Sequence, residues 1–97
     1  MRKYELMYIV KPSLDEEARS AVIEKLHTIL SDNGATFDSV DELGLRELAY
    51  EIKDLTKGYY VVTNFTSDDK ALNEFDRLTR INNDVLRFMI VRLDGQE

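Results

Sequence analysis

The order of two hydrophobic periodicities along the chain limits the folds open to it more than any other feature. Residues 2–10 have the two-residue period of a β-strand, and Pro12 ends this segment. A segment with the helical spacing of apolar residues follows it. Two further strand-like segments, a second helical segment and a last strand-like segment come after that. The expected elements are a strand at 2–10, a helix at 14–32, an extended region that begins at 37, is broken by Gly44 and resumes over 45–52, a strand at 59–65, a helix after Ser67 and a strand at 85–93.

Local signals place the ends of these elements. Ser13, with Glu16 three residues later, forms a capping-box pattern, and Asn33-Gly34 is a typical helix end. Ser67 is expected to cap the second helix, and residues 54–58 have the composition of a hairpin loop.

The order strand, helix, strand, strand, helix, strand predicts an α+β fold of the split βαβ (ferredoxin-like) class. In this sandwich a four-stranded antiparallel sheet carries two helices on one face and leaves the other face open. With 97 residues and no internal linker, the chain is expected to form a single domain over residues 1–97.

Parity along the strands indicates which side chains face the helices. In the first strand the even-numbered set from Tyr4 to Val10 is wholly apolar and is assigned to the core. The third strand is assigned by its odd-numbered set and the last strand by Leu86, Phe88 and Ile90. Parity does not orient the second strand, so the directions of Arg46 and Tyr50 stay open. The open face is expected to display six apolar side chains as a partner-binding patch: Met7, Ile9, Tyr60, Val62, Met89 and Val91.

The amino-acid composition excludes several classes of catalytic and metal-binding site. There is no Cys and one His, which excludes thiolate nucleophiles, cysteine metal sites and histidine triads. His27 lies off the apolar stripe of its helix and is interpreted as a solvated surface residue. We expect no catalytic residue, no metal, no cofactor and no small-molecule substrate. No run of 18 apolar residues occurs, so we expect no membrane association and a cytoplasmic location.

The charge distribution matters more than its sum. The net charge is -6, and the acids concentrate between residues 13 and 42. Residues 77–93 carry four arginines against one acid, and Arg2 and Lys3 form a second basic cluster. Arg87 is the strongest candidate for a phosphate contact, because its parity places it on the open face. The Lys57-Gly58-Tyr59-Tyr60 segment matches the RNA-recognition strand signature only in part, and an ordinary β-strand is the favoured interpretation.

Several segments together resemble one known family. They are Met1-Arg2-Lys3-Tyr4-Glu5, Tyr8-Ile9-Val10 followed by Pro12, Glu42-Leu43-Gly44-Leu45-Arg46, Leu48-Ala49-Tyr50 with Ile52, Gly58-Tyr59-Tyr60 and Val85-Leu86-Arg87-Phe88-Met89. In order and spacing they are similar to the bacterial small-subunit ribosomal protein six family over essentially the whole chain. The fold of that family is the same split βαβ sandwich.

The resemblance implies a structural protein of the small ribosomal subunit. Such a protein would bind the central domain of the small-subunit rRNA together with ribosomal protein eighteen, which would pack on the open face. The RNA-contacting role would fall to Arg2, Tyr4, Arg46, Arg80 and Arg87, and the basic clusters add Lys3 and Arg92.

Two other functions remain open from the residues alone. A small-molecule-binding regulatory domain that dimerises through its open sheet face would explain the apolar patch equally well. An enzyme using paired carboxylates such as Asp41-Glu42 rests on composition alone.

Overall fold

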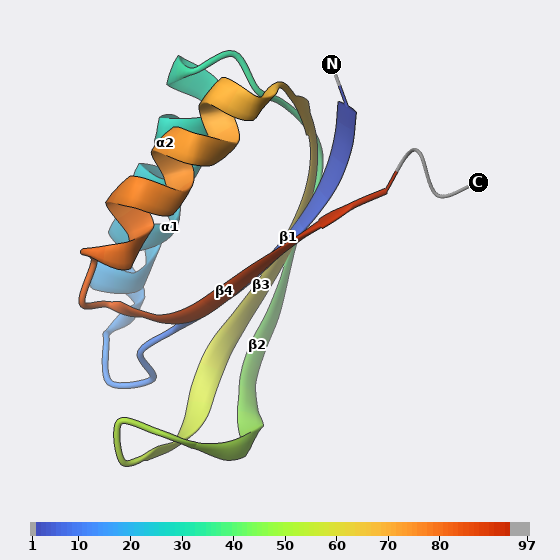
Figure 1. The fold of residues 1–97 in the computed structure, drawn as a ribbon. Coiled ribbons are helices and arrows are strands. Elements are labelled where there is room, and N and C mark those ends of the chain that lie inside the picture. The colour runs from blue at the N-terminus through green and yellow to red at the C-terminus, as the bar shows by residue number, and fades with distance from the viewer. Residues whose placement is uncertain (1, 94–97) are drawn as a thin grey trace.

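The computed structural model describes residues 2–93 and shows the predicted α+β sandwich (Figure 1). The elements in chain order are β1 (Arg2–Val10), α1 (Glu16–Asp32), β2 (Thr36–Ile52), β3 (Leu55–Ser67), α2 (Asp69–Arg80) and β4 (Val85–Arg92). The sheet order is β2-β3-β1-β4, and every neighbouring pair is antiparallel. Both helices pack on one face, and the far end of the β2–β3 hairpin extends beyond them (Figure 1).

The core lies between the helices and the inner face of the sheet. The even-numbered residues of β1 from Tyr4 to Val10 and the odd-numbered residues of β3 from Tyr59 to Phe65 point into it, which confirms both parity assignments. Leu6, Tyr8, Val61 and Phe65 are fully buried there. The helices contribute Val22, Ile23, Leu26 and Leu30 from α1 and Ala71 and Phe75 from α2.

Both helix caps differ from the expected ones. Asp15, not Ser13, caps α1, and its Oδ1 accepts a hydrogen bond of 2.8 Å from the backbone N–H of Ala18. Asp68, not Ser67, caps α2, because β3 continues through Ser67. Aspartate and serine are equally good caps, so a pattern that contains both fixes the helix start only to within two residues.

The β2–β3 hairpin is longer and tighter than expected. Ile52 pairs with Leu55, which leaves only Lys53 and Asp54 in the turn in place of the expected loop at 54–58. Both have positive φ values, 51° and 67°, as in the hairpin turns that match the twist of the strands. Gly44, with φ of 92°, lies at a register shift, so β2 bends there but stays one strand.

A bulge also changes the start of β4. Parity placed Val85 on the open face, but it is 7% exposed and belongs to the core. The register between β1 and β4 shifts between Ile9 and Val10, so Val10 pairs with Val85 while Ile9 pairs with Arg87. One extra residue in β4 at this point turns Val85 toward the helices.

Candidate interaction surface

The outer face of the sheet carries ordered rows of side chains. Met7 pairs with Val62 on one side and with Met89 on the other, so these three form one row across the central strands. Met89 is 51% exposed and Val91 is 42% exposed, and no helix covers this face (Figure 1). Tyr60 and Val62 are half-buried. Five of the six residues predicted for this patch are therefore accessible on the outer face.

The sixth residue, Ile9, was predicted to be displayed on the open face, and this prediction is wrong. It is 5% exposed and therefore not displayed. The end of β2 and the backbone of Gly58 close over it, since a Cβ at Gly58 would lie only 2.2 Å from Ile9 Cγ2. Ile9 thus forms the floor of a depression in the sheet face, and its own side chain is not available for a partner.

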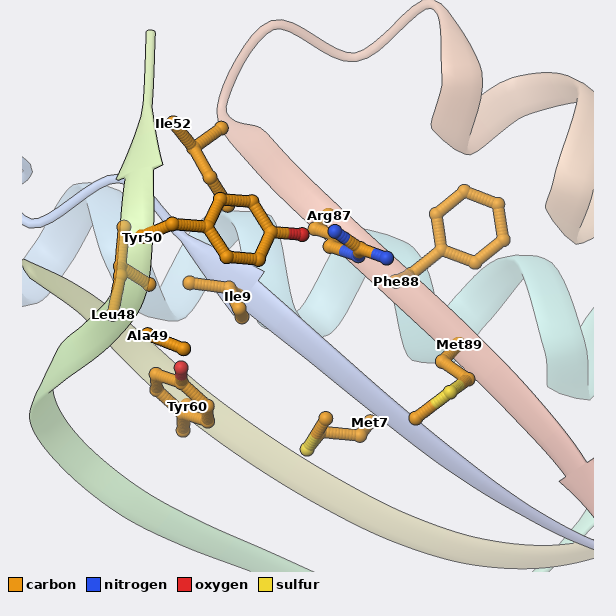
Figure 2. Close-up of a pocket in the computed structure, with 10 residues that line it drawn as sticks. All are labelled: Met7, Ile9, Leu48, Ala49, Tyr50, Ile52, Tyr60, Arg87, Phe88 and Met89. Carbon is orange, nitrogen blue, oxygen red and sulfur yellow. The ribbon is translucent and has the colours of Figure 1, made fainter. Parts of the chain in front are cut away.

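This depression is an apolar groove of about 260 Å³ between β2 and β4 (Figure 2). Its walls combine residues of the predicted patch with a second group from the end of β2: Leu48, Ala49, Tyr50 and Ile52. Sequence reasoning missed this group, because the orientation of β2 could not be fixed by parity. The alternation of Leu48, Tyr50 and Ile52 was the available signal, and it indicates that these three share one face.

Arg87 stands at the rim of this groove. Its guanidinium carbon lies 5.6 Å from the centre of the Tyr50 ring, and Figure 2 shows the two side chains meeting above Ile9. Among residues 2–93, Arg87 has no ion-pair partner. An unpaired cation beside an apolar groove gives the surface one charged contact point within a largely hydrophobic area.

The predicted RNA contacts do not form one cluster. Arg2 and Lys3 begin β1, and Arg92 pairs with Tyr4 at the same end of the sheet. Arg87 pairs with Ile9, five residues beyond Tyr4 along β1, which corresponds to about 17 Å. Arg46 pairs with Gly58 and therefore lies on the outer face, near the groove. The structure thus places cationic residues at both ends of the sheet.

Arg80 lies on the last turn of α2 and has a partner within its own helix. Its Nε donates to both carboxylate oxygens of Asp76, at 3.1 and 3.0 Å, and this bonding raises the pKa of the guanidinium. The guanidinium carbon also lies 5.7 Å from the Phe88 ring centre. Asp76 therefore orients Arg80 and partly neutralises its charge.

Tyr4 cannot present its ring to a base in this structure. The side chain is 5% exposed and packs 5.7 Å from the ring of Phe65, centre to centre. Its even position in β1 points it toward the helices, which is the parity that also made it a core residue. The ring is therefore not available for stacking on a base, and an RNA contact by Tyr4 stays a prediction.

His27 is half-buried and not solvated as expected. Its Nε2 lies 3.0 Å from the hydroxyl of Tyr8, and its ring centre lies 5.0 Å from that of Phe37. Burial lowers the pKa of His27, while the nearby Glu42 carboxylate opposes this effect. Burial likewise raises the pKa of Tyr8. This contact joins α1 to the sheet on the side away from the groove.

The described residues offer little else that could carry chemistry. Within residues 2–93 no group of three or more His, Asp or Glu side chains is arranged to hold a metal ion. No helix in that part of the chain is long and apolar enough to span a membrane. The sheet sandwich, its uncovered apolar groove and its border cations define a binding module.

Comparison with known proteins identifies the family. The sequence model described as "Ribosomal protein S6" matches residues 3–92. The small ribosomal subunit protein bS6 of Exiguobacterium sibiricum is 47% identical over 92 residues, covering 95% of this chain and 97% of that protein. The chain therefore belongs to the ribosomal protein S6 family. It is a small-subunit ribosomal protein with a structural and not an enzymatic role.

One solved structure agrees with this assignment, and a second shares only the fold. The 30S ribosomal protein S6 of Thermotoga maritima superimposes with a TM-score of 0.90 at 32% identity, covering 95% of this chain and 87% of that one. The C-terminal domain of the MgtC protein of Mycobacterium tuberculosis gives a TM-score of 0.63 at 11% identity, covering 100% of this chain and 93% of that domain. The second likeness shows only that the fold is shared.

Proposed function

We propose that this protein binds the central domain of the small-subunit rRNA jointly with ribosomal protein eighteen. The observation that carries the proposal is the uncovered apolar groove with Arg87 at its rim, since Arg87 contacts the Tyr50 ring but has no ion-pair partner among residues 2–93. The family likeness supports the assembly context, and the groove supports a protein partner within it. The partner would pack on Met7, Tyr60, Val62, Met89 and Val91, with Ile9 as the buried floor.

The RNA contacts would come from the two cationic ends of the sheet. Arg2, Lys3 and Arg92 lie at one end, and Arg46 and Arg87 lie near the groove. A net charge of -6 disfavours RNA binding by this protein alone, since the net negative charge repels a polyanion at long range. Joint binding removes this difficulty, because a partner of positive charge supplies much of the cationic surface.

A salt-titrated binding assay tests the proposal. The purified protein is titrated against a central-domain rRNA fragment with and without ribosomal protein eighteen. Tight binding that weakens steeply with salt is expected only when the partner is present. If this protein neither binds with the partner nor improves the partner's binding, the proposal fails. A stable homodimer in the same samples would then favour a regulatory domain that dimerises through the open face.

Two variants separate the docking face from the rest of the surface. Met89→Glu places a charge in the centre of the exposed apolar row and is expected to abolish partner docking. Ala21→Glu adds the same charge on the exposed side of α1 and serves as the matched control. Equal docking by both variants would remove the open face as the partner's surface.

A further inference from the structure

A second, more polar pocket lies next to the groove, where the hairpin turn, the end of α2 and the start of β4 meet. Its volume is about 370 Å³, and its polar lining comes from Lys53, Thr79, Arg80, Asn82, Asn83 and Arg87. These residues come from three separate parts of the chain. No Asp or Glu among residues 2–93 lines the pocket, although the protein as a whole is acidic.

The positive charges at this pocket are only partly neutralised. Lys53 and Arg87 have no ion-pair partner among residues 2–93. Arg80 bonds Asp76 through Nε alone. Asp84 lies close by in sequence, but its carboxylate is directed to Lys11, at 3.9 Å. The pocket therefore presents more positive charge than its surroundings cancel.

The pocket also has an unsatisfied hydroxyl. Thr79 is 2% exposed, and its Oγ1 has no hydrogen-bond partner among the described residues. A buried polar group without a partner is unfavourable, and such groups are uncommon in folded proteins. The oxygen itself is covered from solvent, so the accessible neutral hydrogen-bonding groups of the pocket are the Asn82 and Asn83 side-chain amides.

The position of Lys53 depends on the backbone of the turn. The two-residue turn holds Lys53 and Asp54 at positive φ, and the Ile52–Leu55 pair fixes the turn to the sheet. Lys53 therefore extends from a short, defined turn toward β4, and not from a long loop. The C-terminal end of α2 carries partial negative charge that opposes an anion here. Arg77 and Arg80 in the last turn are paired with Glu74 and Asp76, so Lys53 and Arg87 supply most of the attraction for an anion.

We infer that Lys53, Arg80 and Arg87 form a site for one backbone phosphate of RNA, with Asn82 and Asn83 as neutral hydrogen-bonding groups. This inference rests on the proposed function and adds a defined phosphate position to it, including Lys53, which neither the charge pattern nor the family likeness singled out. Arg87 lines both this pocket and the apolar groove. The RNA and the protein partner therefore meet at one side chain.

The test compares two lysines of the same hairpin. Lys53→Asn removes the charge but keeps a residue that tolerates positive φ, so the turn is preserved. Lys57→Gln removes a charge from an exposed residue of β3 that does not line the pocket. Each variant is titrated with the rRNA fragment and ribosomal protein eighteen over a range of salt concentrations, and circular dichroism checks that it is folded.

Lys53→Asn is expected to weaken RNA binding several-fold and to reduce the slope of log K against log salt by about 0.7 to 0.9, the share of one phosphate contact. Lys57→Gln is expected to leave both unchanged. If the wild-type protein binds RNA and Lys53→Asn binds with the same slope, the phosphate site is refuted while the proposed function stands. If the wild-type protein does not bind RNA with its partner, both fail.

The phosphate in this pocket could belong to RNA or to a free phosphate compound. A titration of the free protein with inorganic phosphate distinguishes these two sources. Amide signals of Thr79, Asn82 and Arg87 are followed by NMR at constant ionic strength. Shifts at these residues that disappear in Lys53→Asn, together with the reduced RNA slope, support the inference. Phosphate-induced shifts without any change in the RNA slope would assign the pocket to a free phosphate compound and overturn the RNA assignment.

Discussion

Replacing Gly58 with Ala tests whether the packing of β3 against Ile9 is as close as the structure shows. A Cβ at this position would lie 2.2 Å from Ile9 Cγ2, whereas ordinary carbon contacts lie at about 3.5 to 4.0 Å. Ile9 must therefore retreat by about 1.3 Å or more, from a site where it is 5% exposed. Overpacking of this kind costs about 1 to 3 kcal/mol, and the reduced freedom of the unfolded chain returns about 0.4 to 1 kcal/mol.

The expected net loss is about 1 to 2 kcal/mol of unfolding free energy, or roughly 4 to 16 °C in Tm for a domain of this size. Urea and thermal unfolding monitored by circular dichroism measure it. The Ile9→Ala background supplies the control, because it removes the atom that clashes. There Gly58→Ala is expected to be neutral or slightly stabilising. An equal loss in both backgrounds would refute the close-packing argument.

Two further predictions concern α1. Asp15→Ala is expected to lower the unfolding free energy by about 1 kcal/mol and Ser13→Ala by almost nothing, because only Asp15 accepts the Ala18 N–H; similar losses in urea unfolding would contradict this. The lowered pKa of His27 means that the unfolded chain binds its proton more readily, so stability is expected to fall as pH drops through about 6.5. Urea unfolding at pH 7.5 and 5.5 should show a larger loss for the wild type than for His27→Gln, and identical losses would exclude His27 as the source.

The order of elements and the core faces of β1 and β3 could be predicted because they depend on local periodicity. In β1 the even-numbered set is wholly apolar while Glu5 interrupts the odd-numbered set, so the pattern indicates the buried face directly. In β3 both sets are largely apolar, and only the longer odd-numbered set indicates the buried face. The side of β2 that lines the groove could not be predicted in this way. It depends on the bend at Gly44 and on the tight turn at Lys53 and Asp54, which two non-glycine residues form at positive φ.

The errors at individual residues have tertiary causes. Ile9 has the parity of an open-face residue, but the end of β2 covers it once the hairpin forms. Val85 lies on the core face and not on the open face because of a bulge, and no turn residue in the sequence indicates that bulge. His27 lies at the flank of the apolar stripe of α1, and only the packed structure shows Tyr8 directly opposite it. In each case the deciding contact joins residues that are far apart in the sequence.

The two edges of the sheet differ in charge, and this has a kinetic consequence. The outer strand β2 carries five acids and one arginine, while the opposite outer strand, β4, carries two arginines and no acid. The sheet is therefore an electric dipole whose axis crosses the strands. At distances up to about 8 Å in physiological salt, an approaching RNA repels the β2 edge and attracts the β4 edge. This torque turns the protein before any contact forms, so collisions with the β4 edge leading are favoured over random ones.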